Sequence, residues 1–189
     1  MRHLGLLIFL MLLPLCLLAQ EGKILMIIAP EGFRDEELQV PKALFEAKGW
    51  EVDVASKTTR EARGMLGLKV KPDLNLEAVD LSRYSAVVFV GGVGAQLYFS
   101  DPQALHIARE AYRKGKIVGA ICLAPGILAR AGVLRGKKAT VWPSEAETLR
   151  KTGATYTGKA VEVDGSIVTA RGPEAAREFA EAILEILKK

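Results

Sequence analysis

Cys122 is the residue of this sequence best placed to act as a nucleophile. It stands where the apolar run KIVGAIC, over 116–122, meets the expected helix LAPGILARAG, over 123–132. A residue at such a sharp strand-to-helix turn is held above the sheet, and the amides that open the next helix point toward it. Those amides and the helix dipole are expected to lower the pKa of the thiol and to favour a thiolate at neutral pH. The alternative is a small, buried apolar side chain.

Three acidic residues, Asp35, Glu36 and Glu37, open the helix expected over 35–49. Glu37 lies about one turn into that helix, near the same edge of the sheet as Cys122, where a carboxyl is able to shuttle a proton. Acids in a first turn also complement the helix dipole, and Asp35 is the expected cap. Spacing alone does not choose among the three acids.

Gly91 and Gly92 directly follow the apolar run AVVFV. Glycines at the end of a strand let the backbone approach a substrate closely, and an amide there is able to pair with one after Cys122 to hold an oxyanion. A plain turn is the alternative. The stretch GGVGAQ lacks the spacing of a dinucleotide fingerprint, which excludes a nicotinamide or flavin site of that kind.

A doubly wound α/β fold is needed to bring these residues together, and the alternation of short apolar runs with amphipathic stretches predicts one. In open sheets of this kind, ligands bind beyond the carboxyl ends of the strands, near the switch in strand order. Strands are expected over 23–29, 51–56, 86–92 and 116–122, a partly extended stretch over 67–76, a hairpin over 159–170 with a type I′ turn at Asp164-Gly165, and helices over 35–49, 102–114, 123–132, 144–151 and 173–189.

The first twenty residues, MRHLGLLIFLMLLPLCLLAQ, are interpreted as a secretory signal peptide. Arg2 and His3 precede a long apolar stretch that contains no acidic residue, which is the usual order of such signals. Cleavage would leave one domain over 21–189, exported to the periplasm or the cell exterior, whereas a retained segment would anchor the chain in a membrane. Cleavage also removes Cys16, so Cys122 would have no intrachain disulfide partner.

The charge balance argues against a nucleic-acid surface. The 189 residues include 26 Lys and Arg and 22 Asp and Glu. Removing Arg2 with the first segment leaves 25 basic and 22 acidic side chains, a net charge of +3. Such a mild and dispersed excess is not typical of a nucleic-acid-binding face.

Four motifs, taken in order, resemble the ThiJ/PfpI superfamily, within the class I glutamine amidotransferase-like group. They are FRDEELQVP, VGGVGAQ, AICLAPGILARAGVLRGKKAT and TARGP, and the resemblance extends over about residues 23–188. It implies a flavodoxin-like, mostly parallel sheet with helices on both faces, and a homodimer. It matches the family's acid to Glu37, its nucleophile to Cys122, its oxyanion amides to Gly92 and Leu123, and a minor position to Arg171.

Two positions depart from the family pattern. PfpI-type members carry a histidine directly after the cysteine, where this chain has Leu123, and Trp142 stands where the deglycase branch has another histidine. His106, the remaining histidine of residues 21–189, is expected on a solvated or partner-facing helix surface. A cysteine peptidase without a nearby imidazole lacks its usual base.

The resemblance therefore implies an enzyme of glyoxalase or deglycase type that needs no metal or organic cofactor. Its substrates would be small reactive aldehydes or the adducts they form on proteins, and Cys122 and Glu37 would carry the reaction. Two alternatives stay open. One is a redox-responsive, chaperone-like dimer in which Cys122 is oxidised to a sulfinate without turnover. The other is a PfpI-type peptidase or amidase.

Overall fold

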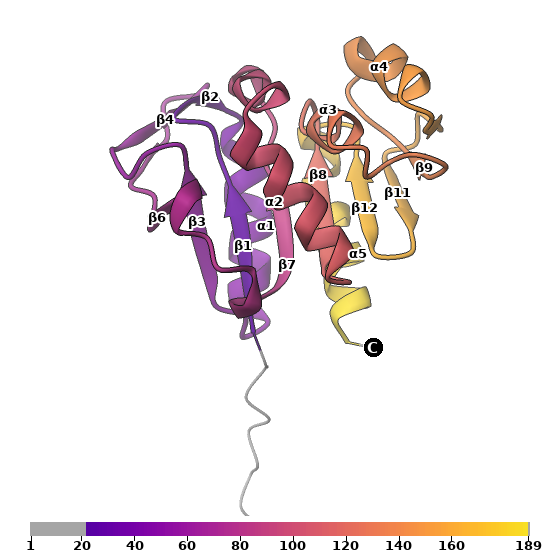
Figure 1. The fold of residues 1–189 in the computed structure, drawn as a ribbon. Coiled ribbons are helices and arrows are strands. Elements are labelled where there is room, and N and C mark those ends of the chain that lie inside the picture. Colours follow the sequence, from indigo (N-terminus) through magenta and orange to yellow (C-terminus); the bar gives the residue numbers. More distant parts are fainter. Residues whose placement is uncertain (1–21, 189) are drawn as a thin grey trace, which may run out of the picture.

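A seven-stranded sheet forms the centre of the computed structural model, which describes residues 22–188; Figure 1 shows how its strands are arranged. The strands pair in the order β11-β12-β8-β7-β1-β3-β6, and every pair except β11 with β12 is parallel. They are β1 (Lys23–Ile27), β3 (Val52–Ser56), β6 (Leu74–Asn75), β7 (Tyr84–Phe89), β8 (Ile117–Ile121), β11 (Val161–Asp164) and β12 (Ile167–Ala170). The predicted doubly wound, mostly parallel α/β sheet is confirmed.

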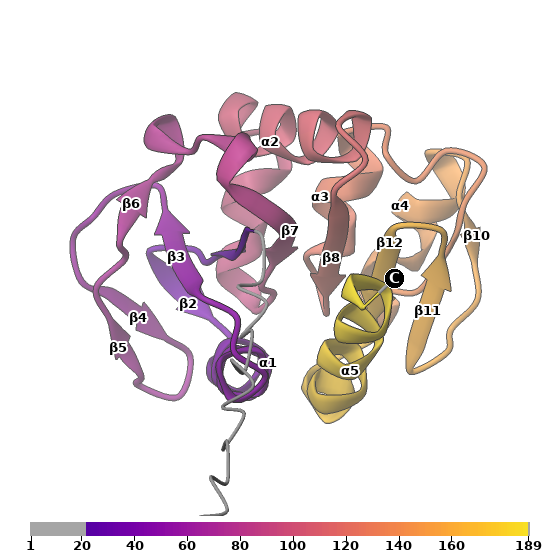
Figure 2. The same ribbon diagram turned by 90° about the horizontal axis from the view of Figure 1, so that it is seen from below.

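Helices cover both faces of the sheet. α1 and α5 lie side by side on one face, and α2 and α3 lie on the other (Figure 2). The helices are α1 (Asp35–Ala47), α2 (Pro102–Arg113), α3 (Pro125–Arg130), α4 (Ala146–Lys151) and α5 (Ala176–Leu187). Gly119 of β8 lets α5 pack closely, because a Cβ at Gly119 would lie 2.9 Å from side-chain carbons of both Phe179 and Ile183.

The central strands are buried because helices cover both of their faces. All five residues of β8 are buried, and in β1 only Lys23 is partly exposed. Strands of a parallel sheet covered on both sides need continuous apolar runs rather than alternating ones. The runs KILMI and IVGAI meet this requirement, which explains why the sequence pattern located both strands.

The strand order reverses beside β1. After β1 the chain adds β3 and β6 on one side, and then returns to add β7, β8 and β12 on the other side. The carboxyl ends of β1, β7 and β8 are therefore neighbours at the switch point where α/β sheets bind ligands. Glu37, Gly91 and Cys122 follow these three strands in turn.

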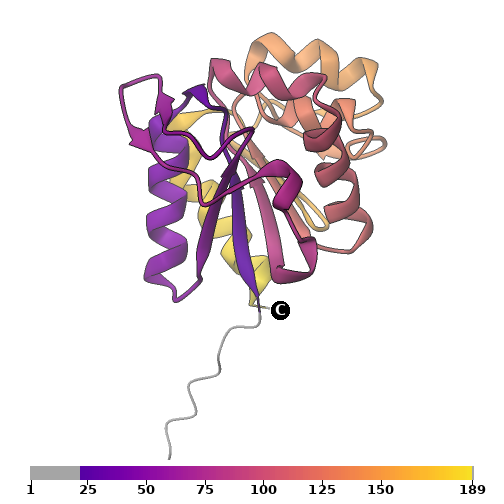
Figure 3. The ribbon, with the colours of Figure 1, turned by 60° about the vertical axis from the view of Figure 1, so that its left-hand side comes forward.

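Two smaller sheets flank the central one. β2 (Glu31–Phe33), β4 (Ala62–Gly64) and β5 (Lys69–Val70) form the first, and β9 (Lys138–Ala139) pairs with β10 (Thr155–Tyr156) in the second. Figure 3 shows the β4–β5 hairpin beside the start of α1. Asp35 joins the two, since its carboxylate accepts hydrogen bonds from the amides of Leu66 at 2.9 Å and Leu68 at 2.7 Å. The expectation that Asp35 caps α1 is therefore wrong, and Arg34 occupies the cap position.

Two further expectations differ from the structure. The helix expected over 123–132 begins only at Pro125, because the three residues from Cys122 form a turn. In the β11–β12 hairpin, Asp164 pairs with Ile167, so the turn residues are 165 and 166 rather than 164 and 165. Of these two, only Gly165 has a positive φ, of 64°. One positive φ at the first turn position suits a type II′ turn rather than type I′.

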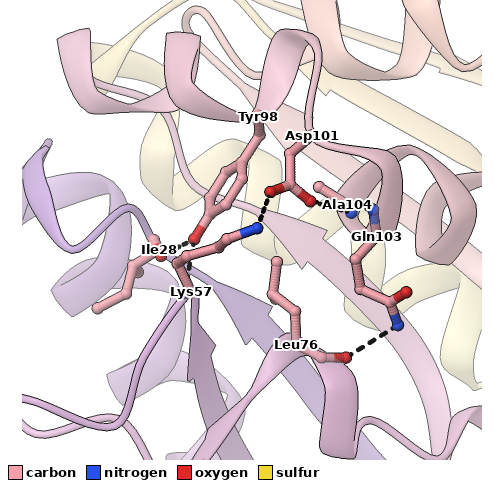
Figure 4. A network of polar contacts seen from close by, with 7 residues as sticks. All are labelled: Ile28, Lys57, Leu76, Tyr98, Asp101, Gln103 and Ala104. Atoms are coloured by element: carbon pink, nitrogen blue, oxygen red, sulfur yellow. Dashed lines mark hydrogen bonds and ion pairs between the residues drawn. The ribbon is translucent and has the colours of Figure 1, made fainter.

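A polar network holds the 3₁₀ segment η3 (Val93–Phe99) at the carboxyl edge of the sheet (Figure 4). The Tyr98 hydroxyl donates to the carbonyl of Ile28 at 2.8 Å and accepts from the amide of Lys57 at 3.1 Å. The Lys57 ammonium pairs with Asp101, whose carboxylate also caps α2. Because η3 starts directly after Gly92, the network fixes the segment that leaves the glycine pair.

The signal peptide expected over residues 1–20 lies outside the described residues. Within 22–188, no helix combines the length and the apolar character needed to cross a bilayer.

Candidate active site

Cys122 occupies the turn after β8 in the left-handed backbone conformation. Its φ is 61°, and the other residues with positive φ in the described chain are glycines. The Cys122 amide donates to the carbonyl of Ala170 at 2.9 Å, and its carbonyl accepts from the amide of Trp142 at 2.8 Å. These bonds hold a conformation that costs a non-glycine residue about 1–2 kcal/mol. The turn has the strained geometry of a nucleophile elbow.

The thiol of Cys122 is shielded from solvent, with 8% of the residue exposed. Burial, followed by the charge of Glu37, raises the pKa of this thiol to about 12. Hydrogen bonds from the amides of Gly92 and Leu123 lower the pKa of the thiol, but burial outweighs them. The expectation of a lowered pKa is therefore wrong. The helix that follows has only six residues and begins three positions after Cys122, so its dipole adds little.

Glu37 is fully buried beside this thiol. Its Oε2 accepts a hydrogen bond of 3.0 Å from the amide of Gly91. Burial raises the pKa of Glu37 to about 8, although the Cys122 side chain and the Gly91 amide both lower it as hydrogen-bond partners. Its Oε1 is buried and has no hydrogen-bond partner of normal geometry among the described residues. The carboxyl is therefore protonated at neutral pH, with one oxygen free to carry or deliver the proton.

The two glycines of the pair have different positions in the site. A Cβ at Gly91 would lie 2.5 Å from the carbonyl oxygen of Ile121 and 2.6 Å from Glu37 Oε2, so only glycine fits there. Gly92 has a φ of 90°, and a Cβ there would lie 2.5 Å from the Arg34 amide. The Gly91 amide donates a hydrogen bond to Glu37 Oε2, whereas the Gly92 amide faces the sulfur of Cys122.

A pocket of about 260 Å³ opens in front of the thiol. It is lined by Arg34, Glu37, Met65, Gly92, Val93, Cys122, Leu123, Trp142 and Pro173. The structure thus brings together Cys122, Glu37, Gly92 and Leu123, which sequence reasoning selected. A larger hollow of about 560 Å³ lies between α1 and α5, but its lining includes no cysteine, serine or threonine.

Arg171 does not line this pocket. Its Nε donates to Glu174 at 3.3 Å and its amide donates to the carbonyl of Ala160 at 2.9 Å. Arg171 is thus an ion-pair partner just after β12 rather than a pocket residue.

No imidazole lines the pocket. His106 is exposed on α2 and contributes to a separate surface hollow with Asp80 and Glu110. Within residues 22–188, no cluster of three or more His, Cys, Asp or Glu side chains is arranged to hold a metal ion.

Four lining residues were not selected from the sequence: Arg34, Met65, Val93 and Pro173. They come from separate segments of the chain, and Val93 and Pro173 each begin a 3₁₀ segment, so no local pattern connects the four. One signal was present, because Met65 and Val93 are apolar residues in stretches rich in glycine, where solvent exposure is common.

The chain matches the DJ-1/PfpI family over residues 22–186. It is 46% identical over 173 residues to an uncharacterized protein of Methanocaldococcus jannaschii, covering 90% of this chain and 84% of that one. It is 34% identical over 166 residues to a deglycase of Pyrococcus horikoshii, covering 88% of this chain and 99% of the other. The crystal structure of a ThiJ/PfpI domain protein from Brachyspira murdochii superposes with a TM-score of 0.86 at 33% identity, covering 88% of this chain and 98% of that one. The protein with the buried Cys122–Glu37 pair therefore belongs to the DJ-1/PfpI family.

Proposed function

We propose that this protein is an enzyme that converts reactive aldehydes, or the adducts they form on proteins, through Cys122 and Glu37. The observation that carries the proposal is the strained Cys122, with its sulfur beside a buried, protonated carboxyl and facing two backbone amides. The similarity to a deglycase of Pyrococcus horikoshii supports the same class of substrate.

The proposed reaction with a 1,2-dicarbonyl compound begins with addition. The sulfur of Cys122 bonds to the aldehyde carbon while Glu37 gives its proton to the carbonyl oxygen and takes up the thiol proton, so the product is a hemithioacetal. Glu37 then gives its proton to the neighbouring carbonyl oxygen and takes up the remaining aldehyde proton, which leaves an enediol. It returns that proton to the second carbon and takes up the hydroxyl proton of the first carbon, so a thioester of a 2-hydroxy acid forms and Glu37 is again protonated. Water hydrolyses the thioester, which releases a 2-hydroxy acid and restores the thiol.

The raised pKa values fit this sequence of steps better than a preformed thiolate does. With Glu37 protonated and Cys122 a thiol at pH 7, the pair holds the two protons that the addition must rearrange. The amides of Gly92 and Leu123 stabilise negative charge on the sulfur as the thiol loses its proton. Peptide hydrolysis is less well supported, because the thiol of a cysteine peptidase is usually activated by an imidazole base and no imidazole lines the pocket.

A direct test follows the conversion of methylglyoxal to lactate by the purified mature protein. We expect turnover by the wild type, none by Cys122→Ala, and a loss of about 10²–10⁴-fold in Glu37→Gln. Glu46→Gln is the matched control, since Glu46 is an exposed acid on the same helix. Equal rates for the wild type and Cys122→Ala would rule out the proposed mechanism.

We further propose that residues 1–20 direct export and that the mature chain is a homodimer. Both come from the sequence. Fractionation of a bacterial host, with the intact mass of the exported protein, tests the first. Light scattering of the mature chain tests the second.

A further inference from the structure

The pocket in front of Cys122 has mainly apolar walls. Met65, Val93, Leu123, Trp142 and Pro173 line it, and they come from five separate segments of the chain. Three of them are large apolar side chains left in contact with solvent: Met65 is 42% exposed, Val93 56% and Trp142 43%. Apolar side chains that are exposed together at a pocket usually mark a surface that a ligand covers.

Backbone contacts hold two of these walls in place. The Trp142 amide donates to the Cys122 carbonyl at 2.8 Å, so the tryptophan is tied to the nucleophile itself. Its indole lies so near Gly172 that a Cβ there would be 3.1 Å from the ring. The Met65 amide donates to the Phe33 carbonyl at 2.8 Å. These hydrogen bonds hold the backbone that carries Trp142 and Met65, and the Trp142 ring also lies against Gly172.

The one cationic side chain of the pocket is already paired. The Arg34 guanidinium forms an ion pair with Glu36: Nη2 donates to Oε1 at 3.0 Å, and Nε lies 2.8 Å from Oε2 without hydrogen-bond geometry. The Glu36 carboxylate offsets the positive charge that Arg34 would otherwise present to an acidic substrate. With Glu37 protonated as well, the pocket favours a neutral substituent over an acidic one.

We propose that the site selects carbonyl compounds in which the group beside the reacting carbonyl is aromatic or bulky and apolar, and that Leu123 and Trp142 determine this specificity. This inference rests on the proposed function and names its substrate class. Leu123 follows the nucleophile directly and the Trp142 amide donates to the Cys122 carbonyl, so both residues line the pocket beside Cys122. An aromatic substituent would lie against the exposed indole, while its aldehyde carbon meets the sulfur of Cys122.

The first test compares kcat/KM for phenylglyoxal and methylglyoxal, measured as initial rates. We expect the wild type to favour phenylglyoxal by about tenfold or more, the range in which apolar pockets discriminate. Trp142→Ala should reduce this preference about tenfold, because kcat/KM falls more for phenylglyoxal than for methylglyoxal. Leu97→Ala is the matched control, because Leu97 is also exposed but does not line the pocket. A wild-type ratio near one, or a ratio unchanged in Trp142→Ala, would overturn the inference.

A second measurement separates this inference from the proposed function. Binding of acetophenone and of acetone to Cys122→Ser is followed by saturation-transfer NMR, which needs no turnover. Binding of acetophenone at least about tenfold tighter than acetone, and weakened by Trp142→Ala, supports the apolar site even if neither dicarbonyl is consumed. Equal binding of the two ketones overturns it, whatever the activity of the wild type.

Discussion

The amide of Gly91 donates a 3.0 Å hydrogen bond to Oε2 of Glu37, although 54 residues separate them in the sequence. Gly91 follows β7 and Glu37 lies in α1, so the bond joins two elements at the switch point of the sheet. A side chain at position 91 would occupy the space of the carboxyl, since its Cβ would lie 2.6 Å from Oε2. The location of the Glu37 carboxyl therefore depends on the absence of a side chain at position 91, directly after β7.

Gly91→Ala should displace the Glu37 carboxyl and reduce methylglyoxal turnover by at least about tenfold. The conflict is steric and involves the backbone carbonyl of Ile121, which has little freedom to move. Gly126→Ala is the control, because its Cβ would mainly meet the flexible ends of the Arg130 and Glu145 side chains. Circular dichroism confirms that both variants fold. Full activity in folded Gly91→Ala would contradict the role given to this contact.

The burial of Glu37 should make the stability of the fold depend on pH. Its pKa is raised from 4.5 to about 8 in the folded chain, so between these values the unfolded chain loses the proton while the folded chain keeps it. Stability falls as pH rises through this window and levels off above it. Each pKa unit corresponds to about 1.4 kcal/mol, so Glu37→Gln should gain on the order of a few kcal/mol over the wild type between pH 5 and pH 9.

Urea unfolding of both proteins at pH 5, 7 and 9 measures this difference. Glu46→Gln should follow the wild type at all three values, because Glu46 is exposed. A constant difference between Glu37→Gln and the wild type would mean that the carboxyl is ionised in the folded chain at pH 5.

The sequence located most of the sheet because apolar runs such as KILMI and IVGAI report burial directly. It also placed Cys122 and the glycine pair at strand ends, where topology brings distant segments together. The side chain of Asp35 was assigned wrongly, since its partners are amides more than thirty residues away. An aspartate at the start of a helix has the same neighbours in the sequence whether its carboxylate caps that helix or binds the amides of a distant hairpin.

The thiol pKa shows a different limit of the sequence. Position at the elbow predicted that amides opening the next helix would face the sulfur, but the amides that do so are those of Gly92, after β7, and Leu123, before α3. Whether those amides or burial has the larger effect on the pKa of the thiol depends on how much protein surrounds the sulfur. Local sequence does not contain that information, because the covering residues come from several loops.

Alkylation of Cys122 by iodoacetamide should be slow at neutral pH and should accelerate as the pH rises. Burial and the Glu37 carboxyl raise the pKa of the thiol to about 12, so the thiolate is scarce near pH 7. Glu37→Gln should react at the wild-type rate near pH 6, where the carboxyl is neutral, and faster at pH 9, where the wild-type charge opposes the thiolate. Mass spectrometry after timed quenching gives the rates. A wild-type rate that is flat from pH 6 to pH 9 would indicate a thiolate already formed.

Asp35 should influence substrate binding without touching the substrate. Its carboxylate holds the amides of Leu66 and Leu68, and Met65 beside them forms one wall of the pocket. We expect Asp35→Ala to raise KM several-fold with little change in kcat, because the nucleophile and Glu37 keep their places. Stability should fall by about 1–3 kcal/mol, because two hydrogen bonds to the buried Asp35 carboxylate are lost.

Asp80→Ala is the control for Asp35→Ala. Asp80 also accepts a backbone amide, from Ser82 at 2.9 Å, but it is remote from the pocket. It should leave KM unchanged. A fall in kcat without a change in KM for Asp35→Ala would instead place Asp35 in the chemistry.

Replacement of Cys122 should separate stability from activity. The residue adopts a φ of 61°, which glycine tolerates and alanine does not. Cys122→Gly and Cys122→Ala should both lack turnover, yet Cys122→Gly should be more stable than Cys122→Ala by about 1 kcal/mol, because it removes the backbone strain while both lose the thiol. Urea denaturation at pH 7 measures the difference. If the alanine variant proved equally stable, the turn would have relaxed to an unstrained conformation. The positive φ at position 122 would then depend on the cysteine side chain and not on the surrounding backbone.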